Sequence, residues 1–152
     1  MKIALALFVL MTVALSTAHW ECGPSICNKG WTCFIDGPNH LCNEHCDDRI
    51  SLSQTVINKW NDAKTGQPMV QVDVVIKNVG LRTVRNVIID GDDYSIFGTQ
   101  IWNVNRLPTG DLVLPSYQES LVPGQVHKFG YIARGDHPVI LYVKNVIIIW
   151  NK

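Results

Sequence analysis

The sequence lacks an excess of charge of either sign, because 13 Lys and Arg residues balance 13 Asp and Glu residues. Proteins that bind nucleic acids or acidic lipids carry clustered Lys and Arg side chains, whose field attracts phosphate groups. A balanced composition provides no such field. We therefore expect neither nucleic acid nor a membrane surface to be a partner of this protein.

The sequence also lacks the motifs by which catalytic and cofactor sites are usually recognised. It has no G-x-S-x-G elbow, no H-E-x-x-H pair and no phosphate-binding P-loop. Asp90, Asp92 and Asp93 share one expected turn, where carboxylates are usually solvated, and Glu119 lies in a loop. His127 is expected at an outward polar position of a strand. We predict no catalytic residue, no metal ligand and no cofactor, and hence a protein that is not an enzyme.

Long apolar runs are absent after the N-terminus. There, Lys2 precedes the stretch "IALALFVLMTVAL", and the small residues Ser16, Thr17 and Ala18 follow it. A membrane anchor needs ~20 apolar residues, and His19 interrupts this run before that length. A basic start, a short apolar core and small residues at the end are typical of a secretory signal peptide. We predict that residues 1–18 are the signal peptide and that the mature protein is secreted and extracellular.

Cysteine is absent from the C-terminal part of the chain. All five cysteines lie near the N-terminus, at Cys22, Cys27, Cys33, Cys42 and Cys46. So short a segment buries too little apolar surface to fold alone, and an oxidising compartment favours disulfide bonds there. An odd number leaves one thiol free or paired with another chain. The spacing does not determine which cysteines pair.

Zinc binding is the alternative for this segment, because His40 and His45 lie among the cysteines. The spacing C-x4-C-x5-C-x8-C-x3-C lacks the C-x2-C pairs that are typical of structural zinc sites. We therefore favour disulfides. Gly23-Pro24, Gly30 and Gly37-Pro38-Asn39 indicate turns throughout. Residues 19–48 are predicted to form a small disulfide-rich loop module.

Helical periodicity is missing from the rest of the chain. Apolar residues instead alternate with polar ones, most clearly in "VQVDVVIKN", and Gly- or Pro-containing turns separate the runs. Residues 49–152 are therefore predicted to form an all-β domain, a β-sandwich of about seven to eight antiparallel strands. The expected strands are 50–60, 70–76, 84–90, 101–104, 112–114, 126–132 and 139–150. The last and most apolar of them is either a central strand or a chain end that covers an open edge.

Aromatic residues supply the only candidate site. Trp60 lies in "NKWND", Trp102 in "TQIWNVN" and Tyr117 in "PSYQE", each among polar neighbours. A ring in such a setting can stack on the apolar face of a sugar, and neighbours such as Asn103 and Gln118 can bond its hydroxyl groups. A core ring with a polar rim is the plainer alternative. We interpret these five residues as a carbohydrate-binding site.

The runs "WND", "VQVDVVIKNVG", "IWNVN" and "LVLPSYQESLVPGQVHKFGYI" resemble carbohydrate-binding module family 49, over roughly residues 50–149. This family occurs in plant endoglucanases and in cellulose-associated proteins of social amoebae. The resemblance implies a non-catalytic sandwich that binds cellulose or a related β-glucan through exposed aromatics. By motif these are Trp60, Trp102 and Tyr117. The family often has Trp where Tyr117 stands, so a smaller stacking area is expected there.

A second resemblance is to the tapetum-determinant ligands of plants, and it predicts a secreted signalling ligand that binds a receptor ectodomain. Those ligands carry cysteines within the sandwich, whereas this chain has none after Cys46. We therefore favour the carbohydrate-binding module. The run "CNKGWTC" resembles small disulfide modules of extracellular matrix proteins, which suggests a second protein as a partner of the cysteine-rich segment.

Overall fold

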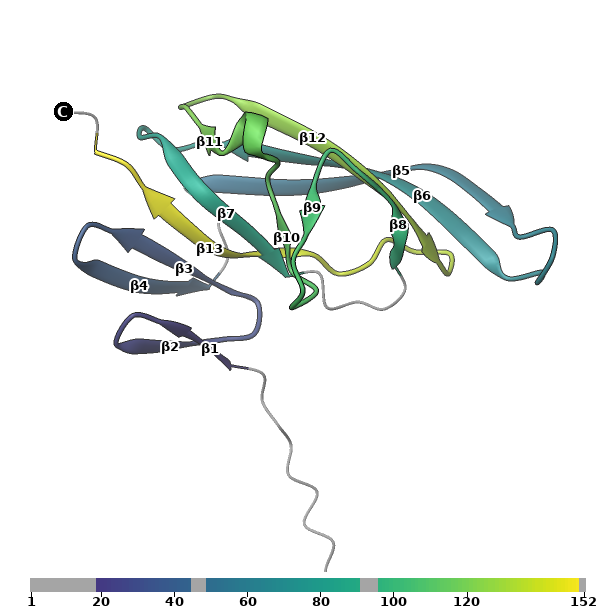
Figure 1. The fold of residues 1–152 in the computed structure, drawn as a ribbon, viewed down its shortest axis with the longest axis horizontal. Helices are drawn as coiled ribbons and strands as arrows, with labels where there is room; N and C mark the ends of the chain where they lie inside the picture. The colour runs from purple at the N-terminus through teal and green to yellow at the C-terminus, as the bar shows by residue number, and fades with distance from the viewer. Residues whose placement is uncertain (1–18, 45–48, 91–95, 151–152) are drawn as a thin grey trace, which may run out of the picture.

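A computed structural model describes residues 19–44, 49–90 and 96–150 of the chain (Figure 1). Within these ranges the protein is built of strands and one short 3-10 turn. The described part contains no helix of the length and apolarity that crossing a membrane requires. The predicted signal peptide, Cys46 and the predicted domain boundary near residue 48 lie outside the described residues.

One layer of the sandwich is an antiparallel sheet of four strands, which we call the upper sheet. Its order is β5 (Ile50–Asn61), β6 (Pro68–Asn78), β12 (Val126–Arg134) and β8 (Ile96–Trp102). The alternating apolar residues of β6 share one face, as predicted. They are Val70, Val72, Val74 and Ile76, and all four are completely buried. Their intervening neighbours lie on the opposite face of the sheet.

The other layer is a sheet of seven strands, which we call the lower sheet. Its path is β4 (Asn39–Glu44), β3 (Trp31–Asp36), β13 (Tyr142–Ile148), β7 (Val84–Asp90), β10 (Leu112–Val113) and β9 (Asn105–Arg106), while β11 (Ser120–Leu121) pairs with β7. Strand β13 lies between β3 and β7. The last strand is therefore central, which accounts for its apolar sequence.

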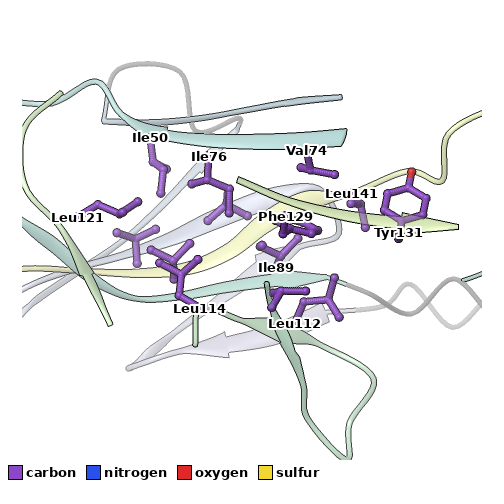
Figure 2. Close-up of a cluster of buried hydrophobic side chains, with 14 of the residues drawn as sticks. Ile50, Val74, Ile76, Ile89, Leu112, Leu114, Leu121, Phe129, Tyr131 and Leu141 are labelled. Carbon is purple, nitrogen blue, oxygen red and sulfur yellow. The ribbon is translucent and has the colours of Figure 1, made fainter. Parts of the chain in front are cut away.

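The hydrophobic core lies between the two sheets. Figure 2 shows side chains of the upper sheet, such as Ile76 and Phe129, pointing toward Ile89 and Leu112 of the lower sheet. All four are at most 2% exposed. The all-β sandwich predicted from the sequence is confirmed.

The cysteine-rich segment contains two hairpins. β1 (His19–Cys22) pairs with β2 (Ser25–Asn28), and β3 pairs with β4. The expected turns at Gly23 and Gly37 join these strands, and both glycines adopt the positive φ that turns favour. β3 also pairs in parallel with β13, so the β3–β4 hairpin continues the lower sheet.

Two disulfides connect the hairpins, Cys22–Cys33 and Cys27–Cys42. The disulfide interpretation is therefore confirmed for these four cysteines, whose pairing the spacing left open. Trp20 and Trp31 pack against them in a small cluster. Trp20 also stacks on Tyr142 of β13, with ring centroids 5.6 Å apart. The hairpin layer thus packs directly against the lower sheet.

A buried hydrogen-bond cycle closes one side of the sandwich. The Tyr131 hydroxyl donates to Gln54 Oε1 at 2.6 Å and accepts from the Val139 amide at 2.9 Å. Gln54 Nε2 donates in turn to the Val139 carbonyl at 2.9 Å. The cycle fastens the segment before β13 to two strands of the upper sheet.

Replacing Tyr131 with phenylalanine should therefore lower the free energy of unfolding by about 1–3 kcal/mol, because the Val139 amide loses its buried acceptor. Chemical denaturation measures this value. Ile132→Val, a small apolar change in the same strand, is the control. A free energy of unfolding equal to that of the wild type would contradict the assigned role of the cycle.

Candidate functional site

The candidate site lies on the outer face of the upper sheet, the face turned away from the core. In β12, Phe129, Tyr131 and Ala133 point inward and are at most 2% exposed. Because side chains alternate along a strand, Gly130 and Ile132 belong to the outer face. The positions that pair with them in β6 and β8 belong to the same face.

Trp102 covers the outer face at its β8 edge. It pairs with Gly130, and a Cβ atom placed on Gly130 would lie only 2.3 Å from the Trp102 ring. The ring therefore lies directly over the glycine, with one side against the backbone of β12. The Trp102 side chain remains half-buried. A half-buried ring on the outer face of the sheet differs from a ring in the core.

Trp60 lies on the same face, near the far end of β5. It pairs with Met69, which pairs in turn with Arg134 of β12. Gly130 and Arg134 are four residues apart along β12, and β5 lies two strands away from it. Standard strand rise and spacing then place the backbone of Trp60 roughly 17 Å from Gly130, over which the Trp102 ring lies. The sheet thus brings the two predicted tryptophans onto one surface.

Polar side chains fill the space between the two rings. Thr55 of β5 pairs with Asp73 of β6, which pairs with Gly130, so these three residues lie side by side across the sheet. Asn58 and Gln71 form the next cross-strand pair toward Trp60. All four polar side chains are at least partly exposed. They present hydroxyl, carboxylate and amide groups, which can bond to sugar hydroxyls. The sequence analysis did not assign these residues to the site, because the cross-strand register determines their position.

Tyr117 projects from the 3-10 turn Ser116–Gln118 and is 72% exposed. Its ring lies 6.4 Å from that of His127, and His127 Nε2 lies 2.6 Å from the Asn103 carbonyl oxygen. These contacts place Tyr117 near the end of β8, where Trp102 and Asn103 are located. Tyr117 is the most exposed of the three predicted rings.

The expectation for His127 was wrong. The side chain is only 7% exposed and lies on the inner side of β12. Strand parity explains the difference, because His127 is two residues before the buried Phe129. It holds the Asn103 carbonyl while Asn103 adopts a left-handed backbone with φ of 59°, which asparagine tolerates better than most residues. His127 thus fixes the corner between β8 and β9.

The two predicted polar residues differ in their freedom to reach a ligand. The Asn103 side chain is exposed beside Trp102. Gln118 is half-buried, and its Nε2 donates to the Ser120 carbonyl at 2.6 Å. Gln118 therefore stabilises the turn that presents Tyr117. Asn103 is the better placed of the two to contact a sugar.

The turn after Trp60 depends on an ionised carboxylate. Asp62 Oδ1 accepts from the Lys64 amide at 2.7 Å and the Thr65 amide at 2.9 Å. The bond from Thr65 and then that from Lys64 hold the pKa of Asp62 below its ordinary value of 3.8, and the charge of Arg134 adds to this.

A folded-state pKa below the unfolded value means that the stabilisation is complete above pH 3.8 and is lost as the pH falls through the lower folded value. We therefore expect the Lys64 and Thr65 amides to lose protection from hydrogen exchange in strongly acidic solution. Asp62→Asn should remove this pH dependence. Equal protection in the wild type at neutral and strongly acidic pH would contradict the assignment.

The sequence analysis did not assign Gly130 or Trp150 to a site. Gly130 supports the Trp102 ring, and its only signal was a glycine inside a strand, which can mark a close approach of another group. Trp150 follows β13 and is 64% exposed, although its apolar run indicated a structural role. No signal in the run "NVIIIW" distinguishes a buried ring from an exposed one.

The chain is similar in sequence to known proteins over most of its length. The family model of the carbohydrate binding domain CBM49 matches residues 50–134, from β5 through β12. Stalk-specific protein A of Dictyostelium discoideum is 37% identical over 95% of this chain and 98% of its own length. Stalk-specific protein B of the same organism is 35% identical over the same shares.

Among solved structures, an exo-β-N-acetylglucosaminidase from Vibrio harveyi aligns with 58% of this chain and 13% of its own, at a TM-score of 0.45 and 8% identity. The matched range 50–134 contains the whole upper sheet and all three predicted rings. The chain therefore belongs to the CBM49 family of carbohydrate-binding domains, and its role is carbohydrate binding.

Proposed function

We propose that the protein is a secreted, non-catalytic module that binds cellulose or a related β-glucan by aromatic stacking on the outer face of the upper sheet. Trp102 is the central ring, Trp60 extends the surface along the sheet, and Tyr117 adds a ring at the β8 corner. The observation that carries the proposal is the Trp102 ring, which packs directly over Gly130 on the outer face of the sheet and remains half-buried.

The uncharged polar side chains on this surface suit a neutral polysaccharide as the ligand. Stacking uses the apolar C–H face of a sugar, and the amide and hydroxyl groups of Asn58, Gln71 and Thr55 can bond hydroxyl groups without a charged partner. Aromatic positions roughly 17 Å apart on one sheet suit an extended chain better than a single sugar. Each stacking contact is individually weak, and several on one chain together give useful retention.

The proposed setting is an extracellular coat or wall. The sequence begins with a segment typical of a signal peptide, and the described cysteines form disulfides, as is usual for exported proteins. The two curated relatives are named stalk-specific proteins. We extend that setting to this chain, where binding to a structural glucan would retain the protein.

The cysteine-rich segment is the proposed contact for a second protein. The two described disulfides use four of the five cysteines of the sequence, and Cys46 is the fifth. A bridge from Cys46 to another chain would link two carbohydrate-binding surfaces and raise retention through effective concentration. Non-reducing electrophoresis of the wild type and of Cys46→Ser distinguishes a linked form from a monomer.

Sedimentation with insoluble polysaccharides tests the proposed function. The protein is incubated with microcrystalline cellulose, chitin or insoluble xylan, and the amount left in the supernatant is measured. We expect depletion by cellulose, and less depletion for Tyr117→Ala, which loses an exposed ring. Glu119→Ala, a change of an exposed neighbour in the same loop, is the matched control. Protein that remains wholly in the supernatant with cellulose would contradict the proposal.

A further inference from the structure

The side chains of Trp150 and Arg82 stack on each other at the end of the molecule opposite to Trp60. The guanidinium carbon of Arg82 lies 4.1 Å from the centre of the Trp150 ring. Arg82 is itself held by Asp36, through hydrogen bonds of 2.8 and 3.2 Å to the two carboxylate oxygens. The guanidinium therefore supports one face of the ring, as the backbone of Gly130 supports Trp102.

This stack does more than attach the β3–β4 hairpin to the sandwich. The Arg82–Asp36 pair already joins the loop after β6 to β3 without any help from the ring. Trp150 remains 64% exposed, so burial of its own surface contributes little to stability. A large ring that is held in place but left open to solvent is available for an external ligand.

The surroundings of the stack have the character of a sugar site. Arg82 also lines a hollow of about 260 Å³, together with Leu81 and Ile148. Leu81 is 95% exposed, and it presents a further apolar surface beside polar groups of the Asp36–Arg82 pair. The hollow is smaller than the pockets of ≈ 300–1,000 Å³ that enclose a whole small molecule. Its lining does not include Trp150, so the hollow extends the surface beside the ring.

We propose that Trp150, supported by Arg82 and Asp36, is a second carbohydrate-stacking site that takes one sugar residue of a neutral polysaccharide. This inference rests on the proposed carbohydrate binding but on different residues. Asp36 and Trp150 both lie outside residues 50–134, which match the family. The second site therefore combines the cysteine-rich segment and the chain end with a loop of the sandwich.

The two sites lie at opposite ends of the sandwich. Asn78, at the end of β6, pairs with Ile50 and donates its side-chain amide to the Arg82 carbonyl at 2.8 Å. Trp60 is ten residues further along β5 than Ile50, a distance of about 33 Å in an extended strand. One polysaccharide chain bound at Trp60 and another at Trp150 would be bridged by a single protein molecule. The proposed consequence is cross-linking of glucan chains.

Indole NMR signals test the second site separately from the first. The full secreted chain is labelled with 15N-tryptophan, and its five indole signals are assigned by single Trp→Phe variants. Soluble cellohexaose is then added. We expect the Trp150 signal to shift together with those of Trp60 and Trp102, and Arg82→Met to reduce the Trp150 shift alone. Lys29→Met, a similar change at an exposed residue beyond the other end of β3 from Asp36, should preserve the Trp150 shift.

The possible results distinguish the second site at Trp150 from the proposed site on the upper sheet. Shifts of Trp60 and Trp102 without one of Trp150 would overturn the second site and leave the first. A shift of Trp150 alone would support the second site and overturn the first. A spectrum that does not change overturns both.

Cross-linking is then measured by light scattering of cellulose nanocrystals, with Cys46→Ser in every protein to exclude disulfide-linked dimers. We expect Trp150→Ala to abolish bundling while adsorption is retained, and Trp150→Phe to restore part of it. Bundling that is unchanged in Trp150→Ala would overturn the bridging role.

Discussion

Replacing Gly130 with alanine is expected to weaken binding to cellulose about as much as removing the Trp102 ring. The new methyl carbon would lie 2.3 Å from that ring, so the ring must leave its place over β12. Loss of one central aromatic contact costs about 2 kcal/mol, or about 30-fold in affinity. Adsorption isotherms on microcrystalline cellulose measure the change for Gly130→Ala and Trp102→Ala.

The double variant is the control for this prediction. Once Trp102 is alanine, the methyl group at residue 130 meets no ring, and the second substitution should have no further effect on affinity. Thermal unfolding of each variant shows that the sheet is still folded. Gly130→Ala that binds with the affinity of the wild type would contradict the stacking role, as would additive losses in the double variant.

Removing the Cys22–Cys33 disulfide is expected to have a large effect on stability. The bridge closes a loop with a sequence separation of 11, which corresponds to about 3 kcal/mol in the chain-entropy account. For a domain of this size that loss lowers the Tm by about 10 °C. The variant is Cys22→Ser with Cys33→Ser, and calorimetry measures the unfolding temperature.

The same variant should bind cellulose normally after correction for the folded fraction. The upper sheet, which carries Trp60 and Trp102, pairs with none of β1 to β4. We therefore expect this variant to lose stability without losing affinity for cellulose. An unchanged Tm would contradict the structural role of the bridge, and a loss of affinity in the folded variant would place the cysteine-rich segment in the binding surface.

The sequence predicted the parts of the fold that depend on local pattern. The alternation in β6 identified its buried face. The polar neighbours of Trp102 indicated an exposed ring, and the structure leaves it half-buried. One feature depends on contacts between distant segments and had no local signal. The parallel pairing of β3 with β13 joins segments more than a hundred residues apart, as the Cys33–Asn145 pair shows.

Some features of the site residues could be predicted from the neighbouring sequence, and others depend on contacts between distant segments. The exposed ring of Tyr117 was predicted from its neighbours in the chain, and the structure leaves it 72% exposed. The support that Gly130 gives to Trp102 depends on register, which a single sequence does not specify. Trp150 owes its orientation to Arg82, which is distant in sequence and lies over the ring. His127 lies on the inner face because it is two residues before the buried Phe129 in the same strand. Its polar side chain alone indicated the outer face.

Oxidative footprinting of the tryptophans on cellulose tests the central claim most directly. The protein, free or adsorbed on microcrystalline cellulose, is exposed briefly to a mild oxidant, and mass spectrometry measures the oxidation of each tryptophan. Trp20 and Trp31 pack against the disulfides and serve as internal controls. We predict that adsorption protects Trp60 and Trp102 and leaves Trp20 and Trp31 unchanged. Adsorbed protein in which Trp60 and Trp102 are oxidised as fast as in the free protein would contradict this account.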